Sequence, residues 1–289
     1  MKIRYGALLV VAAAAACSAD DPQPAAGSDA STPGNDAAVT PDGTVPPPQD
    51  GSALPDGKAP PDAAIVPADD GGPPLTYGQT YSGGEFHLGP VDYDETVWHN
   101  ACAPGTKYAT SVRQVEGTLL AGLWDGIQGV AGYCDACIYV TTAKGKSATL
   151  RVVTYGATTP NSIDVSPDAY AILNSGEYPR SMTWQFAKCP STGKLMYEFQ
   201  TGSSEWWTSL WVRNGRVPLK SVEVKSVNHA SYVALARGTD GTLTDGAGFG
   251  KGTFSIRLTG IDNQQVIDTF AWPSAGVAGA MLIGQGNLQ

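Results

Sequence analysis

Short apolar runs separated by turn residues dominate the chain from residue 150 onward, a pattern typical of β-strands. Runs rich in β-branched and aromatic residues lie at 150–154, 182–186, 195–199, 210–213, 217–220, 222–225 and 254–258. Asn214 and Gly215 separate two of these runs. Because Asn-Gly supplies positive φ at both turn positions, the pair predicts a two-residue hairpin.

Two segments carry helical signals. Ser166, Pro167 and Asp168 supply an N-cap, a proline at the first helical position and an early acid, which predict a short helix over 166–173. Apolar residues at helical spacing over 112–123 follow a capping box at 111–114 and predict a second helix. Strands with one or two helices, followed by strands alone, indicate a small mixed barrel and then a β-sandwich, with the seam at 189–193.

The first 75 residues differ from this body in composition. They contain 13 of the 21 prolines but one of the 25 aromatic residues, Tyr5. Such a segment cannot bury enough apolar surface to offset chain entropy, so we expect it to be disordered. Residues 76–289 carry the other aromatic residues and are long enough for one large or two ordinary domains.

Residues 1–17 are typical of an export signal. Lys2 and Arg4 precede an apolar run over 7–16, which is too short to span a bilayer. The run ends in small residues before Cys17, which resembles a bacterial lipobox and predicts an acylated anchor at Cys17. Ala14 stands where that motif usually has Leu, so cleavage and free secretion are the alternative.

Residues 18–75 follow as a linker rich in Pro, Ala, Gly and Asp, which predicts an extended spacer or, alternatively, a degradable leader. Residues 1–75 carry ten Asp against Lys2, Arg4 and Lys58, which is −7 of the net charge of −9. The near-neutral body has no excess of Lys and Arg, so a nucleic-acid partner is excluded and a neutral polymer is favoured over an anionic one.

Four cysteines remain after Cys17, namely Cys102, Cys134, Cys137 and Cys189. In an exported protein an even number predicts two disulfides, with three possible connectivities. Residues 134–137 also have the spacing of a redox or zinc motif. There is no second such motif and the three histidines are scattered, so neither a metal nor a cofactor is expected.

A collinear series of motifs resembles the expansin family over about residues 75–271. The matching segments are 76–77 (TY), 81–84 (YSGG), 144–146 (KGK), 163–170 (IDVSPDAY), 184–190 (WQFAKCP), 193–197 (GKLMY), 202–207 (GSSEWW), 211–214 (WVRN), 217–218 (VP), 248–250 (GFG), 255–258 (SIRL) and 268–269 (DT). The resemblance implies a six-stranded double-ψ β-barrel over 76–190, an immunoglobulin-like β-sandwich that binds polysaccharide over 191–272, and a tail over 273–289. It also implies disulfides joining Cys102 to Cys134 and Cys137 to Cys189.

Trp206 and Trp207 are the strongest chemical signal. An exposed indole can cover the apolar face of a β-glucan, a contact of about 1–2 kcal/mol judged from aromatic contacts generally. Neighbouring residues of a strand point to opposite faces, so displaying both rings requires an irregular backbone, which residues 202–204 could permit. The alternative is that one ring is core and the other lies at an interface.

Several positions depart from the family's binding surface. A third aromatic residue is replaced by Asp240 or a neighbour, and a Lys of bacterial members is replaced by Gln200. Trp211 either supplies a replacement ring or fills the sandwich core. Tyr232 is another candidate for the missing ring.

The barrel groove forms the second expected site. Thr76 and Asp164 match residues that hydrogen-bond there in bacterial expansins, although Asp164 could instead be a helix-end carboxylate. Tyr155 replaces the family's first Asp, Ala157 falls at about the position of a family Tyr, and the segment to Asp164 is two residues shorter. Glycoside hydrolysis ordinarily needs a second carboxyl group, so we expect no catalytic residue.

The leading hypothesis is therefore a secreted, monomeric, non-hydrolytic protein, tethered through Cys17, that binds cellulose or another neutral cell-wall glucan and loosens the wall network. One alternative is a polysaccharide-cleaving enzyme on the same barrel, either an endoglucanase or a peptidoglycan lytic transglycosylase. Another is an adhesin that only binds cellulose.

Overall fold

The computed structural model describes residues 72–90, 98, 101–102 and 116–289, which belong to one compact unit, Asp62–Gln289. The predicted export signal, the Cys17 anchor, the linker up to residue 71 and the capping box at 111–114 lie outside the described residues. In the part of the chain that is described, no helix has both the length and the apolar character needed to cross a membrane.

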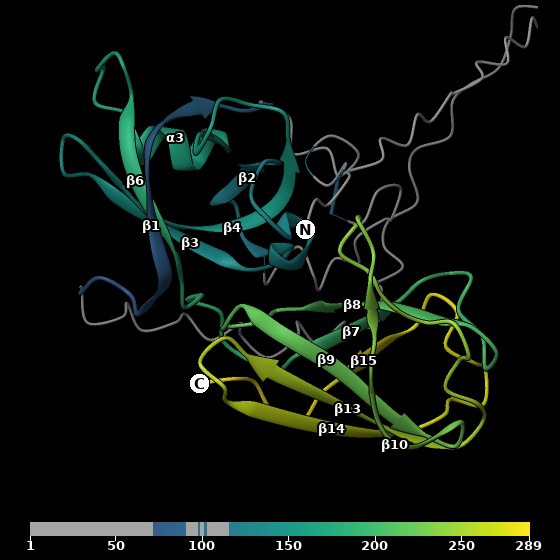
Figure 1. Cartoon of the computed structure of the whole chain (residues 1–289). Coiled ribbons are helices and arrows are strands. Elements are labelled where there is room, and N and C mark those ends of the chain that lie inside the picture. Colours follow the sequence, from purple (N-terminus) through teal and green to yellow (C-terminus); the bar gives the residue numbers. More distant parts are fainter. Residues whose placement is uncertain (1–71, 91–97, 99–100, 103–115) are drawn as a thin grey trace, which may run out of the picture. The chain divides into compact units, whose positions relative to one another are not determined.

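Six strands close into a barrel in the order β1-β5-β2-β4-β3-β6 (Figure 1). Their bounds are β1 Thr76–Leu88, β2 Leu120–Trp124, β3 Cys137–Thr142, β4 Ser147–Gly156, β5 Ile163–Val165 and β6 Ser181–Ala187. The pairs β1/β5 and β2/β4 are parallel, and the other neighbours are antiparallel. The closed mixed barrel confirms the expected first fold.

The barrel is filled by apolar side chains from every strand. Phe86, Ile138, Leu150, Val152 and Ile163 are fully buried in one cluster. Alternate residues of a strand face opposite sides, so the residues between these core positions lie on the outer face of the barrel. Asp164, beside the buried Ile163, is one of them.

The predicted helix is present as α3, Pro167–Leu173 (Figure 1). Ser166 is its N-cap residue and Asp168 lies in its first turn, as expected. The Ser166 hydroxyl, however, accepts a hydrogen bond from the Leu120 amide at 3.0 Å and donates one to the Thr118 carbonyl at 2.6 Å. It therefore fastens the helix to the barrel rather than capping its amides.

The predicted helix over 112–123 is wrong for residues 120–123, which belong to strand β2, although residue 116 is helical. Leu123 packs in the barrel core, whereas Leu120 packs outside it against Trp98 and Val153. A strand buried on both faces has apolar residues at consecutive positions, and this removes the alternation that normally distinguishes it from a helix.

Two sheets form the second part of the fold, with the strand orders β10-β9-β13-β14 and β11-β12-β8-β7-β15. The bounds are β7 Met196–Phe199, β8 Thr208–Arg213, β9 Leu219–Ser226, β10 His229–Ala234, β11 Ala236–Arg237, β12 Leu243–Asp245, β13 Thr253–Gly260, β14 Gln265–Ala271 and β15 Met281–Ile283. Tyr197, Phe199, Phe249, Phe254 and Ile256 fill the space between the sheets. This arrangement confirms the expected β-sandwich.

The sandwich extends beyond residue 272, where the sequence predicted a tail. Strand β15 pairs with β7, and Val277 and Leu288 are buried. The Gly- and Ala-rich composition concealed these few apolar positions. Residues 273–289 are therefore part of the fold.

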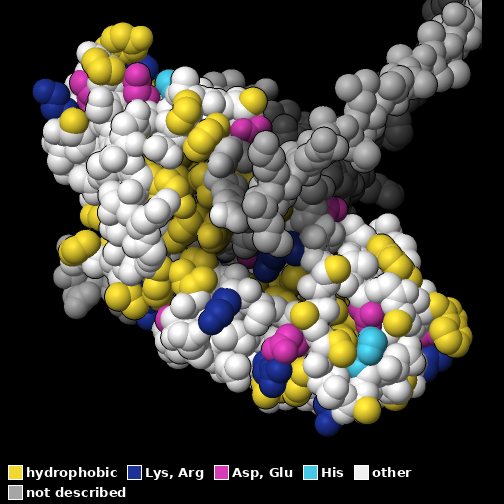
Figure 2. Space-filling model, in the orientation of Figure 1, with side chains coloured by type: hydrophobic (Ala, Val, Ile, Leu, Met, Phe, Trp, Pro, Cys, Tyr) yellow, Lys and Arg dark blue, Asp and Glu magenta, His cyan; other side chains and the backbone are white. Residues whose placement is uncertain are grey.

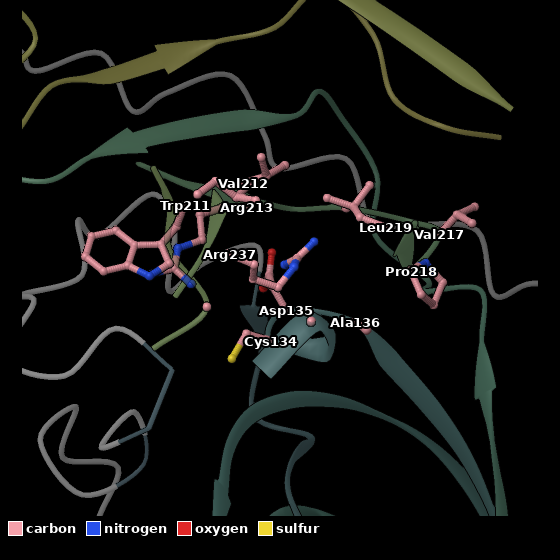
Figure 3. Close-up of a pocket in the computed structure, with 14 residues that line it drawn as sticks. Cys134, Asp135, Ala136, Trp211, Val212, Arg213, Val217, Pro218, Leu219 and Arg237 are labelled. Carbon is pink, nitrogen blue, oxygen red and sulfur yellow. The ribbon is translucent and has the colours of Figure 1, made fainter. Parts of the chain in front are cut away.

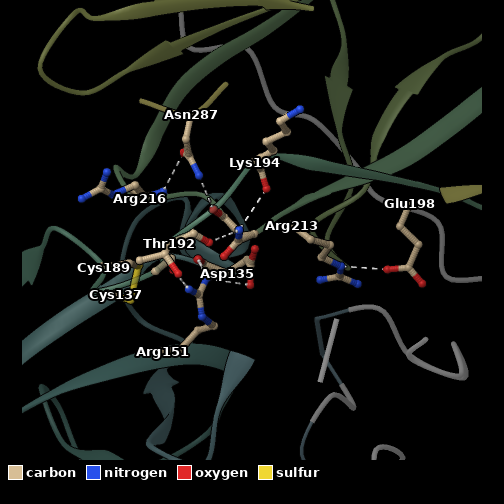
Figure 4. A network of polar contacts seen from close by, with 12 residues as sticks. Asp135, Cys137, Arg151, Cys189, Thr192, Lys194, Glu198, Arg213, Arg216 and Asn287 are labelled. Carbon is tan, nitrogen blue, oxygen red and sulfur yellow. Dashed lines mark hydrogen bonds and ion pairs between the residues drawn. A yellow bond between two sulfur atoms is a disulfide. The ribbon is translucent and has the colours of Figure 1, made fainter. Parts of the chain in front are cut away.

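The hairpin predicted at Asn214-Gly215 is wrong, although Asn214 does adopt a positive φ of 60°. Strand β8 pairs with β7 and β12, whereas β9 pairs with β10 and β13. The turn therefore carries the chain from one sheet to the other. The Asn214 side chain supports this crossing by donating to the Thr192 and Lys194 carbonyls at 3.0 and 2.9 Å (Figure 4).

A buried polar network lies where the barrel strands meet the segment after β6 (Figure 4). The Arg151 guanidinium donates to the Asp135 carboxylate at 3.1 Å and to the Ser191 hydroxyl. Burial raises the pKa of Asp135, and the positive charge of Arg151 opposes that rise. Asp135 thus forms an ion pair with Arg151 of β4, and Arg151 also contacts Ser191 in the segment after β6.

Candidate functional site

Trp206 and Trp207 lie in a tight turn over residues 204–207, immediately before β8. Trp206 is 73% exposed and Trp207 is 38% exposed. The turn is closed by a hydrogen bond from the Ser204 amide to the Trp207 carbonyl at 2.7 Å. The prediction that both rings are displayed from an irregular backbone is confirmed, and their contact with a glucan stays a prediction.

The turn rests on the loop that follows β12. Gly248, with a φ of 68°, lies so close beneath it that an added Cβ would fall 2.2 Å from the Glu205 carbonyl oxygen and 2.5 Å from the Trp206 carbonyl carbon. The Gly250 amide donates to the Glu205 carbonyl at 2.9 Å. Glycine at position 248 therefore allows this close support.

The same loop is itself anchored. The His229 Nε2 atom lies 2.6 Å from an Asp245 carboxylate oxygen, and the other oxygen of Asp245 accepts from the Ala247 amide at 3.0 Å. The Asn228 side chain donates to the Ala247 and Gly248 carbonyls at 3.1 and 2.9 Å. These contacts hold the loop that holds the tryptophans.

Trp211 does not supply a replacement ring, so that alternative is wrong. Its side chain is only 4% exposed, and its indole N–H donates to the Asp240 carbonyl at 3.1 Å. Every residue of β8 is buried, so neither face of this strand displays a side chain to solvent, and Trp211 is buried with the rest. Tyr232 is half-buried, with the Arg257 guanidinium 4.1 Å from the centre of its ring.

Asp164 lies on the outer face of the barrel, beside a glycine of the neighbouring strand β2. In the register of the strands it neighbours His87 of β1 and Gly122 of β2, and Gly122 in turn neighbours Thr154 of β4. A Cβ on Gly122 would fall 2.8 Å from the Thr154 methyl group and 3.9 Å from the Asp164 Cβ. The missing side chain leaves room for Asp164 and Thr154 to approach each other.

Partial burial raises the pKa of Asp164, and the nearby His87 opposes that rise. His87 is one of the three histidines that are scattered along the sequence. The alternation Phe86 in, His87 out along a strand was the signal that could have placed it beside Asp164. The titratable residue that pairs with Asp164 in the strand register is therefore His87.

The other two residues expected in the groove lie elsewhere along the strands. Thr76 is the first residue of β1 and pairs with Ala187, whereas Asp164 pairs near the opposite end of β1. The Tyr155 hydroxyl donates to the Thr239 carbonyl. Burial raises the pKa of Tyr155, and the carboxylates of Asp240 and Asp125 raise it further. The strand register therefore does not place Thr76 beside Asp164. Tyr155 forms its side-chain hydrogen bond with the backbone of Thr239.

An open hollow of about 470 Å³ in the barrel was not predicted from the sequence. Tyr81, Trp124 and Tyr133 line it together with uncharged polar side chains, among them Gln79, Gln128 and Asn161. Tyr81 stacks on Trp184 at 4.0 Å and Tyr133 stacks on Phe186 at 3.9 Å between ring centres, so core residues fix both tyrosines. Its uncharged lining suits a neutral ligand better than an anionic one.

A second cavity is too small to be a binding site. It measures about 20 Å³ and is lined by Cys134, Asp135 and Ala136 on one side and by residues of 211–219, with Arg237, on the other (Figure 3). A space of this size holds about one water molecule.

Both disulfides implied by the family resemblance are confirmed. Cys102 is bonded to Cys134 and Cys137 to Cys189. The 134–137 motif is therefore divided between two separate bonds. Among the described residues no group of three or more His, Cys, Asp or Glu side chains is arranged to hold a metal ion.

The surface charge is mixed on the face drawn in Figure 2. Lys and Arg side chains are scattered there among Asp and Glu rather than gathered in one patch. That face therefore offers no basic track of the kind that follows a phosphate backbone.

Known proteins resemble the chain in both sequence and fold. Expansin-YoaJ of Bacillus subtilis is 26% identical over 208 residues, which cover 71% of this chain and 80% of the relative. Expansin-like protein 6 of Dictyostelium discoideum is 27% identical over 108 residues, covering 36% of this chain and 37% of that protein. No family model matches the sequence.

Solved structures of an expansin from Clavibacter michiganensis have the same fold. The ligand-free protein superimposes with a TM-score of 0.56 at 16% identity, covering 72% of this chain and 98% of the other. A mutant of that expansin in complex with cellohexaose gives a TM-score of 0.55 at 16% identity and the same coverage. The chain thus has the two-part fold of expansins, and its resemblance to bacterial expansins is confirmed.

Proposed function

We propose that the protein is an expansin-like, non-hydrolytic protein that binds cellulose or a related neutral cell-wall glucan and loosens wall polymer networks. The single observation that carries this proposal is the exposure of Trp206 and Trp207 on one glycine-supported turn. The cellohexaose complex of a Clavibacter michiganensis expansin with the same fold supports a cello-oligosaccharide as the ligand.

The physical basis is the apolar face of a β-glucan chain. Its axial C–H groups can lie against an indole plane while its hydroxyl groups stay in contact with water at the edges. The turn is fixed before binding, because Gly248 and the Gly250 amide hold its backbone. A fixed turn reduces the entropy lost on binding.

Hydrolysis is disfavoured by the surroundings of Asp164. Cleavage by two carboxyl groups requires them to be about 5–9 Å apart. Asp164 neighbours His87, Asp168 lies in α3, and Asp135 is buried in an ion pair with Arg151. Binding energy, rather than bond cleavage, would therefore loosen contacts between wall polymers.

The direct test is binding to crystalline cellulose with the supernatant assayed for soluble sugars. We expect the wild-type protein to bind and release none, and Trp206→Ala and Trp207→Ala each to weaken binding roughly fivefold to thirtyfold. Tyr178→Ala is the matched control, because Tyr178 is 84% exposed on the barrel and should leave binding unchanged. Equal binding by all four proteins would refute the proposed site, and a wall-creep assay separates loosening from adhesion alone.

A second candidate is a peptidoglycan lytic transglycosylase. The raised pKa of Asp164 suits a general acid, and this reaction needs no second carboxylate because a hydroxyl group of the sugar attacks. Release of anhydro-muropeptides from peptidoglycan, abolished by Asp164→Asn, would establish this activity. Absence of that release from the wild-type protein would exclude it.

The disulfides fit an exported protein, and the proposal places the protein outside the cell, as a monomer held by a lipid on Cys17. Labelling of the expressed protein with a radioactive fatty acid tests the anchor. Label that persists in a Cys17→Ser variant would contradict it.

A further inference from the structure

An open hollow adjoins the tandem-tryptophan turn of residues 204–207. It measures about 620 Å³, within the range of about 300–1,000 Å³ that is usual for ligand pockets. Three segments line it: the turn through Glu205, the start of β13 through Lys251 and Thr253, and the chain after β14 through Trp272 and Ser274. No sequence motif pointed to this place.

Trp272 forms the apolar wall of the hollow. Its backbone amide donates to the Gly252 carbonyl at 2.9 Å, and its ring packs edge-to-face against buried Phe254 with 6.2 Å between ring centres. The side chain is only partly buried, so the rest of the indole is available at the hollow. A ring fixed in this way meets a ligand with little loss of side-chain freedom.

Glu205 and Lys251 form the polar wall. A Glu205 carboxylate oxygen lies 3.1 Å from the Lys251 Nζ atom, and the Lys251 side chain is 72% exposed. Backbone hydrogen bonding and Lys251 hold the pKa of Glu205 below its ordinary value, so the carboxylate is ionised. A carboxylate accepts hydrogen bonds from sugar hydroxyls and the ammonium donates to them, while the pair contributes no net charge.

The hollow adjoins the turn that carries the exposed rings, because Glu205 of that turn lines it. Glu205 precedes Trp206 in the chain, and the Gly250 amide holds the Glu205 carbonyl beside the start of β13. The Glu205 carboxylate of the polar wall is therefore adjacent in the chain to the exposed Trp206, and Trp272 lines the same hollow.

We propose that this hollow is an additional sugar subsite, in which Trp272 stacks on one further unit of the neutral glucan bound at Trp206, and Glu205 and Lys251 hydrogen-bond its hydroxyls. The inference rests on the proposed function. It adds that the protein selects longer oligosaccharides over shorter ones, because only a longer chain reaches both the turn and the hollow.

The test is titration calorimetry of the full chain with cellotriose, cellotetraose and cellohexaose. For the wild-type protein, affinity is expected to increase with length. In Trp272→Ala, cellohexaose binding is expected to weaken about threefold to tenfold, with cellotriose binding unchanged. Glu205→Gln, a change that removes the charge and keeps the size of a partly buried side chain, is expected to weaken cellohexaose binding in the same length-dependent way.

Control variants separate the possible outcomes. Trp272→Phe replaces the indole by a smaller ring that can still pack against Phe254, so it should weaken cellohexaose binding less than Trp272→Ala does, and it reports on the subsite even if Trp272→Ala fails to fold. Tyr178→Ala should bind every oligosaccharide as the wild type does. If Trp206→Ala loses binding while Trp272→Phe and Glu205→Gln match the wild type at every length, the subsite is refuted and the proposed function stands. If the wild-type protein binds none of the three sugars, the proposed function itself fails.

Discussion

At the scale of single residues, three tryptophans close together in the sequence have different surroundings. Trp211 is buried with a satisfied indole N–H, whereas Trp206 is mostly exposed. We expect Trp211→Ala to reduce the free energy of unfolding by about 3–5 kcal/mol, because it leaves a cavity. Trp206→Ala should change it by less than about 0.5 kcal/mol. Denaturant unfolding measures both, and equal losses would contradict the assigned burial.

Asp164 gives a prediction about pH. Partial burial raises its pKa in the folded state above the unfolded value of about 3.9. A carboxyl group shifted in this direction contributes stability below the unfolded pKa, and this contribution is lost as pH rises through the folded pKa. In Asp164→Asn that loss is absent. The melting temperature of the variant relative to the wild type should therefore rise between pH 4 and pH 7.

Thermal melts of both proteins across that range provide the measurement, with Asp168→Asn as the control. Asp168 lies in the first turn of the neighbouring helix α3. A melting difference for Asp164→Asn that is flat or falls with pH would show that His87, rather than burial, dominates the environment of Asp164.

The sequence predicted the exposed rings but not their surroundings. Tandem Trp after Gly-Ser-Ser was informative because a regular strand cannot display two neighbouring rings on one face. The roles of His87 and Trp272 could not be read in the same way. Each has a neighbour that is distant in the sequence: strand pairing brings His87 beside Asp164, and the folded sandwich brings Trp272 and Glu205 to the same hollow.

At the scale of elements, local sequence signals predicted an element correctly where its own residues determine its structure. The Ser166-Pro167-Asp168 start predicted α3 correctly because capping is a property of adjacent residues. The helix expected over 112–123 failed at β2, and the hairpin at Asn214 failed although the φ was right. In both cases contacts with distant strands determined the structure. Strand β2 is buried on both faces, and the chain after β8 passes to the other sheet.

The loop after β12 gives a prediction at this scale. Gly248→Ala would place a methyl group against the backbone of the turn at a positive φ, so we expect a loss of about 1–3 kcal/mol in stability and weaker cellulose binding. The matched control is Gly246→Ala, where an added Cβ meets nothing within 4 Å. Cellulose binding isotherms and unfolding curves of both variants test it. Unchanged binding in Gly248→Ala would show that the loop does not position the tryptophans.

At the scale of the whole molecule, two separate apolar cores share one chain. The barrel core and the sandwich core have no member in common among the described residues. The link between them is largely polar: the Arg151 guanidinium donates to Ser191, and the Cys189 amide donates to the Arg216 carbonyl at 2.8 Å. Each core should therefore respond by itself to a local loss of stability.

Removal of the Cys137–Cys189 disulfide tests this independence. The bond joins β3 to the segment after β6, across 52 residues of the barrel sequence. Its loss in the double variant Cys137→Ser/Cys189→Ser should cost the barrel about 2–5 kcal/mol, chiefly by freeing the unfolded chain. Hydrogen exchange should then quicken in β4 but not in β13, and cellulose binding should persist, because Trp206 and Trp207 belong to the sandwich. Equal loss of protection in both strands would show that barrel and sandwich unfold as one cooperative unit.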